Sequence, residues 1–292
     1  RIMNKVAAIV VTYNRKELLI KCIEKLQKQT VPLDILIIDN ASTDGTGDMF
    51  KEVPENVKYF NTGKNLGGAG GFNYGLKMAY ALKYDFFWLM DDDTMPYNNA
   101  LEELMKAKDE LKEFGFLSSI AEWVDGKLCN MNIQRTGISK KNLDLEKKYN
   151  AVIMATFVSF FISRKIVREY GYPITDFIIW SDDLEYSRRI SRDYPCYAVS
   201  SSKVIHEMKS NAKVGIENDS DERLWRYKLV YRNEVYVFRR EGIKGWAYLL
   251  FRMFYHSIKI IVKAQHGKMK KLGLIWKSFF SGIKFKPVVE KE

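Results

Sequence analysis

Short apolar runs alternate with helical patterns over the first part of the chain, and this alternation constrains the fold more than any other feature. Apolar runs of strand length occupy residues 6–11, 33–38, 57–60 and 86–90. Helical apolar spacing occupies residues 16–29 and 72–83. Strands that alternate with helices form parallel sheets with right-handed crossovers. We therefore expect an α/β fold with a mostly parallel central sheet.

Polar or glycine-rich segments follow each of these predicted strands. They are residues 12–15, 39–46, 61–71 and 91–93. The carboxyl ends of parallel strands meet at one edge of the sheet, where α/β proteins bind their ligands. This placement predicts a nucleotide site at that edge.

Three consecutive carboxylates, Asp91, Asp92 and Asp93, stand directly after the apolar run of residues 86–90. Adjacent negative charges repel one another unless a cation lies among them, and hard divalent ions prefer oxygen ligands. The cluster therefore predicts a divalent cation bridged to a diphosphate. The alternative is an acidic turn that stabilises the next helix through its dipole.

The glycine-rich segment of residues 61–71 matches neither common phosphate-binding loop. Asn65 follows Lys64 where a Walker A loop has Ser or Thr, and Asn73 stands where the dinucleotide fingerprint needs a glycine. A strand, a glycine-rich loop and a helix could still bring backbone close to an anionic ligand. A tight connection without a ligand is the alternative.

Taken together, these segments resemble the family 2 inverting glycosyltransferases of the GT-A fold. The sequences that carry the resemblance are VVTYNR at 10–15, IDNASTDGT at 38–46, NLGGAGG at 65–71, DDD at 91–93 and WSDDLEY at 180–186. The GGAGG segment points to the branch that holds bacterial galactofuranosyl- and rhamnosyltransferases. The resemblance covers roughly residues 5–210 and implies the fold of nucleotide-diphospho-sugar transferases.

The resemblance implies a nucleotide-sugar site at the ends of the first strands. It places Thr12 and Arg15 near the nucleotide and diphosphate, and Asp39 near the base or ribose. The other residues that it places around the donor are Asn65, Gly67, Gly68 and Asp92.

The same resemblance implies a metal site. Asp91 and Asp93 match the outer positions of the acidic motif, and His206, on a strand beyond the second motif, would be the third ligand. Two carboxylates with one imidazole suit Mn²⁺ or Mg²⁺. A histidine with an ordinary structural role at a strand end is the alternative.

The WSDDLEY motif is expected to begin a helix at position 181 or 182. An inverting transfer needs one carboxylate that takes a proton from the acceptor hydroxyl. Alignment with the family puts Asp183 in this role, with Asp182 and Glu185 orienting the acceptor and Trp180 able to stack on a sugar. Ser181 separates Trp180 from the acidic pair, which departs from some relatives. The alternatives are that the carboxylates only cap the helix and that Trp180 belongs to the core.

Charge divides the chain into a catalytic region, 1–220, and a C-terminal region, 221–292. The second holds 17 basic and 6 acidic residues, a surplus of 11 that equals the net charge of the whole chain. Residues 247–262 are mostly apolar and too interrupted by charge to span a bilayer. Spacing puts the basic residues Arg252, His256, Lys259 and Lys263 on one face of a helix. We expect this face to bind an anionic membrane surface; packing on the catalytic domain is the alternative.

The resemblance implies a metal-dependent inverting glycosyltransferase. On the resemblance alone, it would transfer galactofuranose from UDP-galactofuranose, or alternatively rhamnose from dTDP-rhamnose. The basic C-terminal region favours a lipid-linked glycan at the cytoplasmic face of a bacterial membrane as the acceptor. Three cysteines without metal or redox spacing, and a start without a secretory signal, favour the cytoplasm. A non-catalytic nucleotide- or glycan-binding protein of the same fold is an alternative. No nucleic-acid-binding module is recognisable, so no nucleic-acid partner is expected.

Overall fold

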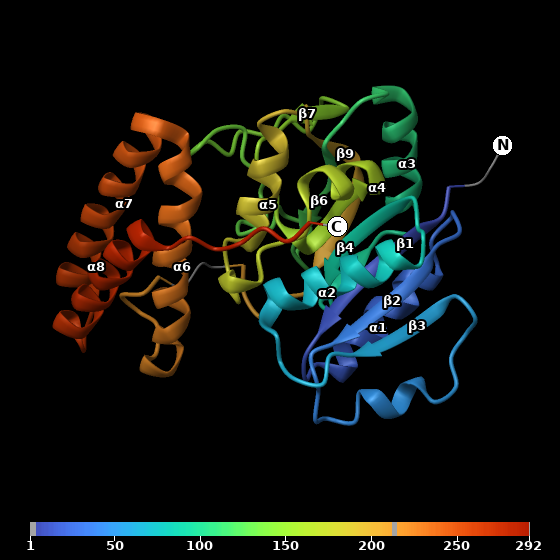
Figure 1. Cartoon of the computed structure of the whole chain (residues 1–292), viewed down its shortest axis with the longest axis horizontal. Helices are drawn as coiled ribbons and strands as arrows, with labels where there is room; N and C mark the ends of the chain where they lie inside the picture. The colour runs from blue at the N-terminus through green and yellow to red at the C-terminus, as the bar shows by residue number, and fades with distance from the viewer. Residues whose placement is uncertain (1–3, 212–214, 292) are drawn as a thin grey trace.

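The computed structural model describes residues 4–211 and 215–291, and the strands in these ranges form one mixed sheet (Figure 1). The strand order is β3-β2-β1-β4-β8-β6-β9-β5, and β7 pairs with β9. The strands are β1 (Val6–Thr12), β2 (Asp34–Asp39), β3 (Val57–Asn61), β4 (Phe86–Asp91), β5 (Thr94–Pro96), β6 (Phe116–Glu122), β7 (Tyr149–Ala151), β8 (Phe160–Ser163) and β9 (Tyr197–His206).

The first half of the sheet is parallel, as the sequence predicts. β3, β2, β1 and β4 all run in one direction. β8 runs antiparallel to both β4 and β6, whereas β6 and β9 are parallel to each other. The short strand β5 pairs antiparallel with the end of β9. This last pairing folds the chain after β4 against the end of β9.

Helices cover both faces of the sheet. The α-helices are α1 (Lys16–Gln27), α2 (Gly67–Ala81), α3 (Ala100–Leu111), α4 (Arg164–Tyr170), α5 (Asp182–Ser191), α6 (Leu224–Phe238), α7 (Gly242–Lys263) and α8 (Lys268–Lys284). The 3₁₀ turns are η1 (Gly47–Phe50), η2 (Phe157–Ser159), η3 (Thr175–Phe177), η4 (Asp221–Arg223) and η5 (Arg239–Glu241). Alternate residues of β1 explain the two layers, since Ile9 packs in the core with α2 and α5, and Val10 packs in the core with α1 and α3.

Helix α2 begins at Gly67, five residues before the predicted start. Residues 62–66 form the predicted loop, but residues 67–71 are the first turns of a helix, so their prediction as a loop was wrong. A Cβ atom at Gly71 would lie 2.6 Å from a side-chain carbon of Val11, and one at Gly75 would lie 2.5 Å from Ile9. The glycines let α2 pack closely on β1, which outweighs their low helix propensity.

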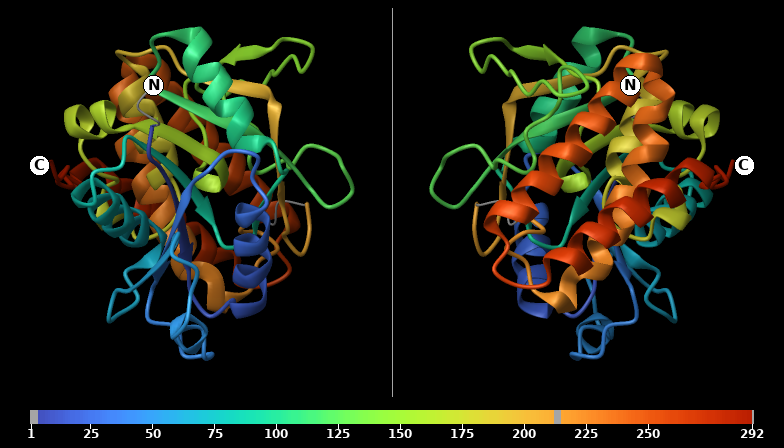
Figure 2. Two further views of the ribbon diagram at one scale, coloured as in Figure 1. Left: turned by 90° about the vertical axis from the view of Figure 1, so that its right-hand side faces the viewer. Right: turned by 90° about the vertical axis from the view of Figure 1, so that its left-hand side faces the viewer.

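The C-terminal helices α6, α7 and α8 pack side by side and share a core of their own (Figure 2). After α8 the chain returns to the catalytic region, where the carbonyl oxygen of Glu290 accepts a hydrogen bond from the amide of Tyr172 (2.9 Å). The helical region starts with η4 at Asp221, close to the predicted division at 220/221. That division stays a prediction, because contacts alone do not define an independent domain.

The basic face of α7 packs inward, so its predicted exposure to a membrane was wrong for three of its four residues. Arg252 forms an ion pair with Glu234 of α6 (2.6 Å), and Lys259 forms one with Glu217 (2.7 Å). Nδ1 of His256 lies 2.5 Å from the hydroxyl of Tyr231. Lys263 is exposed, as predicted. Across the described ranges, no helix combines the length and apolar character needed to cross a membrane.

Candidate active site

Three predicted metal ligands meet where β4 and β9 end and β5 begins. Asp91 is the last residue of β4, Asp93 precedes β5, and His206 is the last residue of β9. Because Thr94 pairs with His206 in the β5–β9 ladder, the histidine is brought beside the acidic segment. One potential ligand atom from each of the three side chains lies within 4.8 Å of the others. The structure therefore brings together the two carboxylates and the imidazole that the sequence singled out.

The imidazole of His206 is oriented by Asn132, which the sequence reasoning missed. The Oδ1 atom of Asn132 lies 2.8 Å from Nδ1 of His206, and Nε2 lies 3.0 Å from Oδ1 of Asp93. An amide oxygen can only accept, so Nδ1 carries the hydrogen and Nε2 is directed at the acidic cluster. Such an outer partner is the usual way to fix a metal-ligating histidine. Asn132 lies in an irregular segment without a motif, so nothing in the sequence marks it.

The electrostatics of this cluster suit a divalent cation. Burial and the neighbouring charge of Asp93 raise the pKa of Asp91 to about 7. Burial lowers the pKa of His206, but hydrogen bonds to Asp93 and Cys129 and the charges of Asp93 and Asp91 together raise this pKa to about 10. The hydrogen bond and charge of His206 in turn lower the pKa of Asp93. A cation would relieve the repulsion between the carboxylates. Two carboxylates and one imidazole form a donor set that fits Mn²⁺ or Mg²⁺.

Arg15 and Thr12 hold the middle carboxylate of the cluster. The Thr12 hydroxyl donates to Asp92 (2.8 Å), and Arg15 donates to Asp92 (3.2 Å) and to Asp93 (2.6 Å). Burial raises the pKa of Asp92 to about 6. The Arg15 side chain is 51% exposed, so its guanidinium could also reach an anionic ligand. Thr12 and Arg15, the two predicted donor-site residues, thus lie directly against the acidic cluster.

Asp39 lies at the end of β2, two strands away from β4. Its carboxylate accepts hydrogen bonds from the Tyr59 hydroxyl (2.6 Å) and from the amide of Ser42 (2.8 Å). Asn14 joins this loop to the end of β1, because its Oδ1 atom accepts from the amide of Thr43 (2.7 Å). The predicted nucleotide end of the site is therefore a connected set of loops.

Gly67 links the donor segment to the second acidic motif. The side chain of Asn65 accepts from the Gly67 amide (2.9 Å). Gly67 has a φ of +73°, and a Cβ atom there would lie 2.4 Å from the carbonyl oxygen of Ile178, so a side chain would be strained and would clash. In the described part of the chain, no atom beyond the chain neighbours and the backbone of its own helix lies within 4 Å of the Cβ position at Gly68, so there is open space beside this residue.

Asp182 and Asp183 form the first turn of α5, as predicted. One oxygen of Asp183 accepts a hydrogen bond from the amide of Leu184 (2.7 Å), and burial raises the pKa of Asp183 to about 6. Burial raises the pKa of Asp182 well above its usual value, and the charges of Asp183 and Asp91 add to this effect. The first acidic motif therefore influences the protonation of the second.

Glu185 and Trp180 have structural partners in addition to their predicted acceptor roles. The buried carboxylate of Glu185 forms an i,i+4 ion pair with Arg189 (2.9 Å) and a longer one with Arg240 (3.8 Å). The ring of Trp180 packs edge-on against Tyr227 with centroids 5.5 Å apart. Binding of an acceptor by either residue stays a prediction.

The segment before α5 is strained. Ile178, Trp180 and Ser181 all have positive φ angles, of +64°, +65° and +68°. Such angles cost non-glycine residues about 1–3 kcal/mol each and persist only where the surroundings enforce them.

Asn233 of α6 is the residue that holds this strained segment, and the sequence reasoning missed it. It is fully buried, and its amide nitrogen lies within hydrogen-bond distance of the carbonyl oxygens of Phe177 (3.1 Å) and Trp180 (3.0 Å). Nε of Arg232 donates to its oxygen (3.0 Å) and thereby fixes the amide orientation. The C-terminal region thus positions the segment that carries Asp182 and Asp183.

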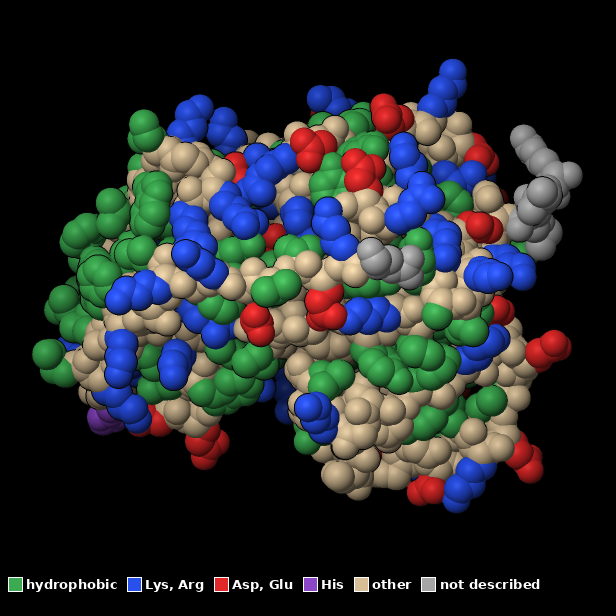
Figure 3. Space-filling model, viewed as in Figure 1, with side chains coloured by type: hydrophobic (Ala, Val, Ile, Leu, Met, Phe, Trp, Pro, Cys, Tyr) green, Lys and Arg blue, Asp and Glu red, His purple; other side chains and the backbone are tan. Residues whose placement is uncertain are grey.

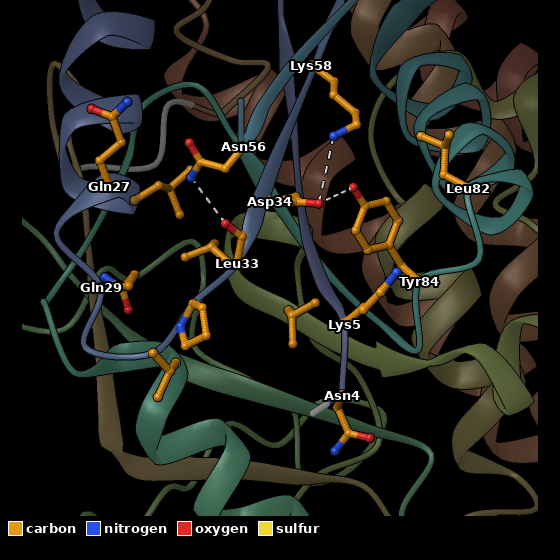
Figure 4. A pocket seen from close by; sticks show the side chains of 14 residues that line it. Asn4, Lys5, Gln27, Gln29, Leu33, Asp34, Asn56, Lys58, Leu82 and Tyr84 are labelled. Atoms are coloured by element: carbon orange, nitrogen blue, oxygen red, sulfur yellow. Dashed lines mark hydrogen bonds and ion pairs between the residues drawn. The ribbon is translucent and has the colours of Figure 1, made fainter. Parts of the chain in front are cut away.

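A pocket of about 660 Å³ lies at the opposite edge of the sheet (Figure 4). Its lining includes Lys5 before β1, Asp34 at the start of β2 and Lys58 in β3. Asp34 is already paired with the Tyr84 hydroxyl and lies 3.8 Å from Lys58. The pocket is therefore separate from the acidic cluster, which lies at the carboxyl ends of the strands.

Comparison with known proteins supports a sugar-transferring site. The family model described as Glycosyl transferase family 2 matches residues 7–171. The galactofuranosyltransferase GlfT1 of Mycolicibacterium smegmatis is 24% identical over 282 residues, covering 85% of this chain and 90% of that protein. The GalNAc(5)-diNAcBac-PP-undecaprenol beta-1,3-glucosyltransferase of Campylobacter jejuni is 28% identical over 183 residues, covering 58% of this chain and 57% of that protein.

Solved structures share the fold. TarS 1–349 of S. aureus superposes with a TM-score of 0.56 at 15% identity, covering 95% of this chain and 72% of that one. The mannosyltransferase PcManGT of Pyrobaculum calidifontis, solved with GDP-Man and Mn²⁺, has a TM-score of 0.59 at 16% identity, covering 98% and 77%. These likenesses confirm the predicted GT-A architecture.

Proposed function

The chain belongs to glycosyl transferase family 2, and from this premise we propose that it transfers galactofuranose from UDP-galactofuranose to a hydroxyl of a lipid-linked glycan, with inversion at the anomeric carbon. The observation that carries the proposal is the cluster of Asp91, Asp93 and His206, whose potential ligand atoms lie within 4.8 Å of one another. This is the kind of group that a metal-bound diphosphate requires. Asp182 and Asp183 would supply the carboxylates that an acceptor hydroxyl requires.

The residues around the first motif would bind the donor. Asp91, Asp93 and His206 would hold Mn²⁺ or Mg²⁺, which would neutralise charge on the departing diphosphate. Arg15, half-exposed beside this cluster, would add a charge-assisted hydrogen bond to a phosphate oxygen. Asp39 would bind the base or ribose, and Gly68, with open space beside it, would flank the donor.

The second motif would supply the base. The acceptor oxygen forms a bond to the anomeric carbon as the bond from that carbon to the diphosphate oxygen breaks, and the bonding electrons leave with the diphosphate. Asp183 would take the proton of the acceptor hydroxyl. With a pKa of about 6, the Asp183 carboxylate is mainly ionised at neutral pH and still basic enough to accept a proton. Asp182 would orient the acceptor.

Galactofuranose and a lipid-linked acceptor are supported by relatives. GlfT1 is a galactofuranosyltransferase and covers most of this chain, and the Campylobacter relative is named for a substrate on undecaprenol. A lipid-linked acceptor favours a cytoplasmic enzyme held peripherally at the inner face of a bacterial membrane. Rhamnose from dTDP-rhamnose is the second candidate.

A donor panel tests the proposal. Purified protein would receive UDP-galactofuranose, dTDP-rhamnose and common UDP-hexoses with Mn²⁺ and a galactofuranose-containing acceptor, and nucleotide release would be measured. We expect acceptor-dependent UDP release from UDP-galactofuranose that is lost in Asp183→Asn. Turnover of dTDP-rhamnose alone would establish the second candidate. Binding of donors without turnover of any would favour a non-catalytic protein of this fold.

A further inference from the structure

The outer side of α7 and α8 is apolar and exposed. Figure 3 shows hydrophobic side chains gathered over these two helices, at the left of the view. The exposed large apolar residues are Ile243, Leu250, Phe251, Phe254, Tyr255, Ile258, Ile261 and Val262 of α7 with Met269, Phe280 and Ile283 of α8. They make up half of the 22 exposed large hydrophobic side chains in the described part of the chain. We call this set the α7–α8 face.

Aromatic contacts make the α7–α8 face continuous across both helices. The ring of Phe254 lies edge-on to that of Trp276, with centroids 5.6 Å apart, and Trp276 lies 6.2 Å from Phe280. Phe251 and Tyr255 stack along α7 at 6.1 Å. A contiguous apolar surface that a soluble monomer would expose is typical of an interaction site.

Basic residues border the α7–α8 face, and the two helices themselves carry no acidic residue. The chain contains no Asp or Glu from position 242 to position 289. The cations on the inner side of α7 are neutralised by Glu234 and Glu217. Within the described ranges, the exposed residues Lys244, Lys263, Lys277 and Lys284 form no ion pair. Their charge is therefore available to an external partner, and Figure 3 shows Lys and Arg side chains beside the apolar surface.

This charge pattern favours an anionic bilayer over a second copy of the chain as the partner of the α7–α8 face. In a symmetric dimer the same patch meets itself, so the basic borders of both copies would face each other without a compensating carboxylate. An anionic bilayer complements both features, because apolar side chains enter the interface while lysines contact the headgroups. We propose that the α7–α8 face is a membrane-docking surface that inserts its apolar residues into an anionic leaflet.

This proposal specifies which surface would hold the protein at the membrane. It rests on the proposed function only for the choice of membrane. It differs from the sequence prediction in two respects: α8 contributes to the surface, and Arg252 and Lys259 stabilise the fold from within instead of contacting headgroups.

Vesicle sedimentation of the full chain tests the surface. The apolar variant combines Phe251→Gln, Ile258→Gln and Val262→Gln, whose parent side chains are 69%, 60% and 70% exposed. Its matched control combines Val53→Gln, Val124→Gln and Leu145→Gln, which remove exposed apolar residues from the catalytic region. A charge variant combines Lys263→Gln, Lys277→Gln and Lys284→Gln. Vesicles contain phosphatidylcholine alone or mixed with phosphatidylglycerol.

We expect wild type and the control to sediment with the mixed vesicles, and the apolar variant to bind at least about tenfold more weakly. The charge variant should lose about fivefold in binding for each lysine removed. Unchanged binding by the apolar variant, or no binding by wild type, would overturn the proposal. So would a wild-type dimer that the apolar variant dissociates, since the face would then join two copies.

Nucleotide release with a water-soluble acceptor, measured on the same samples, separates this proposal from the proposed function. The apolar variant should keep the wild-type rate, which also shows that it folds. Vesicle binding without turnover of any donor would refute the catalytic proposal and leave the docking surface standing.

Discussion

At the scale of single residues, the sequence singled out three candidate metal ligands. Asp91 and Asp93 follow an apolar strand, and the family resemblance points to His206 on a strand beyond the second motif. Asn132 and Asn233 could not be identified from the sequence, because each acts through a contact with a residue more than 50 positions away. Glu185 matched a motif, yet its carboxylate is bound by Arg189 and Arg240. Sequence motifs thus identify candidate metal ligands and catalytic carboxylates more readily than the residues that orient these groups.

The assignment of Asp183 as the base makes a kinetic prediction. Asp183→Asn keeps the size of the side chain and removes the proton acceptor, so turnover should fall by about 10²- to 10⁴-fold. Donor affinity, measured by calorimetry, should change little, because the base acts only in the transition state. Asp182→Asn is the matched control. An inactive Asp182→Asn beside a fully active Asp183→Asn would reverse the two roles.

The raised pKa of Asp183 makes a pH prediction. A base works only when ionised, so kcat/KM at saturating metal should be lost as pH falls through about 6 and should be constant above it. The residual activity of Asp183→Asn should lack this inflection. A wild-type profile without loss of kcat/KM between pH 7 and 5 would show that another group takes the proton.

At the scale of elements, the four strands β1 to β4 were predictable because buried parallel strands read as continuous apolar runs. The start of α2 was not, because glycine usually indicates a loop and here serves close packing on Val11 and Ile9. The orientation of α7 was also beyond the sequence. The basic residues on one face of α7 are compatible with exposure to solvent and with burial against acidic partners. Only the packing of α6 against α7 shows that Glu234 pairs with Arg252.

The ion pair between Arg252 and Glu234 makes a stability prediction. Both side chains are largely buried, so Arg252→Gln leaves an uncompensated carboxylate and should destabilise the fold by about 3–5 kcal/mol. Urea unfolding would measure the change. Lys263→Gln, at an exposed and unpaired position of the same helix, should alter stability by less than about 0.5 kcal/mol. Equal, small effects would mean that the pair is solvated in solution.

The hydrogen bonds from Asn233 make a prediction about positioning. Asn233→Asp keeps the shape but cannot donate to the carbonyls of Phe177 and Trp180, so the strained segment should shift and carry Asp183 with it. We expect kcat to fall by about 10- to 100-fold. The KM for the donor should change less than kcat, because the substitution does not alter Arg15 or the proposed metal ligands. A fall confined to thermal stability, with kcat at its wild-type value, would indicate a purely structural residue.

At the scale of the whole molecule, charge and chemistry are divided between two regions. Residues 1–220 carry equal numbers of basic and acidic side chains and hold the acidic cluster, whereas residues 221–292 carry the entire net charge. Helix α6 connects the two regions. Its Asn233 donates a hydrogen bond to the segment before α5, and its Glu234 forms an ion pair with Arg252 of α7. The composition of the chain could predict the division, but only the fold shows that the basic region also supports the catalytic one.

The central claim is that the acidic cluster serves metal-dependent transfer from a nucleotide sugar. The most direct test is donor turnover by metal-stripped protein, with Mn²⁺ or Mg²⁺ added back, in wild type and in Asp93→Ala. The account predicts no turnover in EDTA, recovery of wild type with added metal, and no recovery of Asp93→Ala at the same metal concentration although it stays folded. Full activity of metal-stripped wild type in EDTA would contradict it.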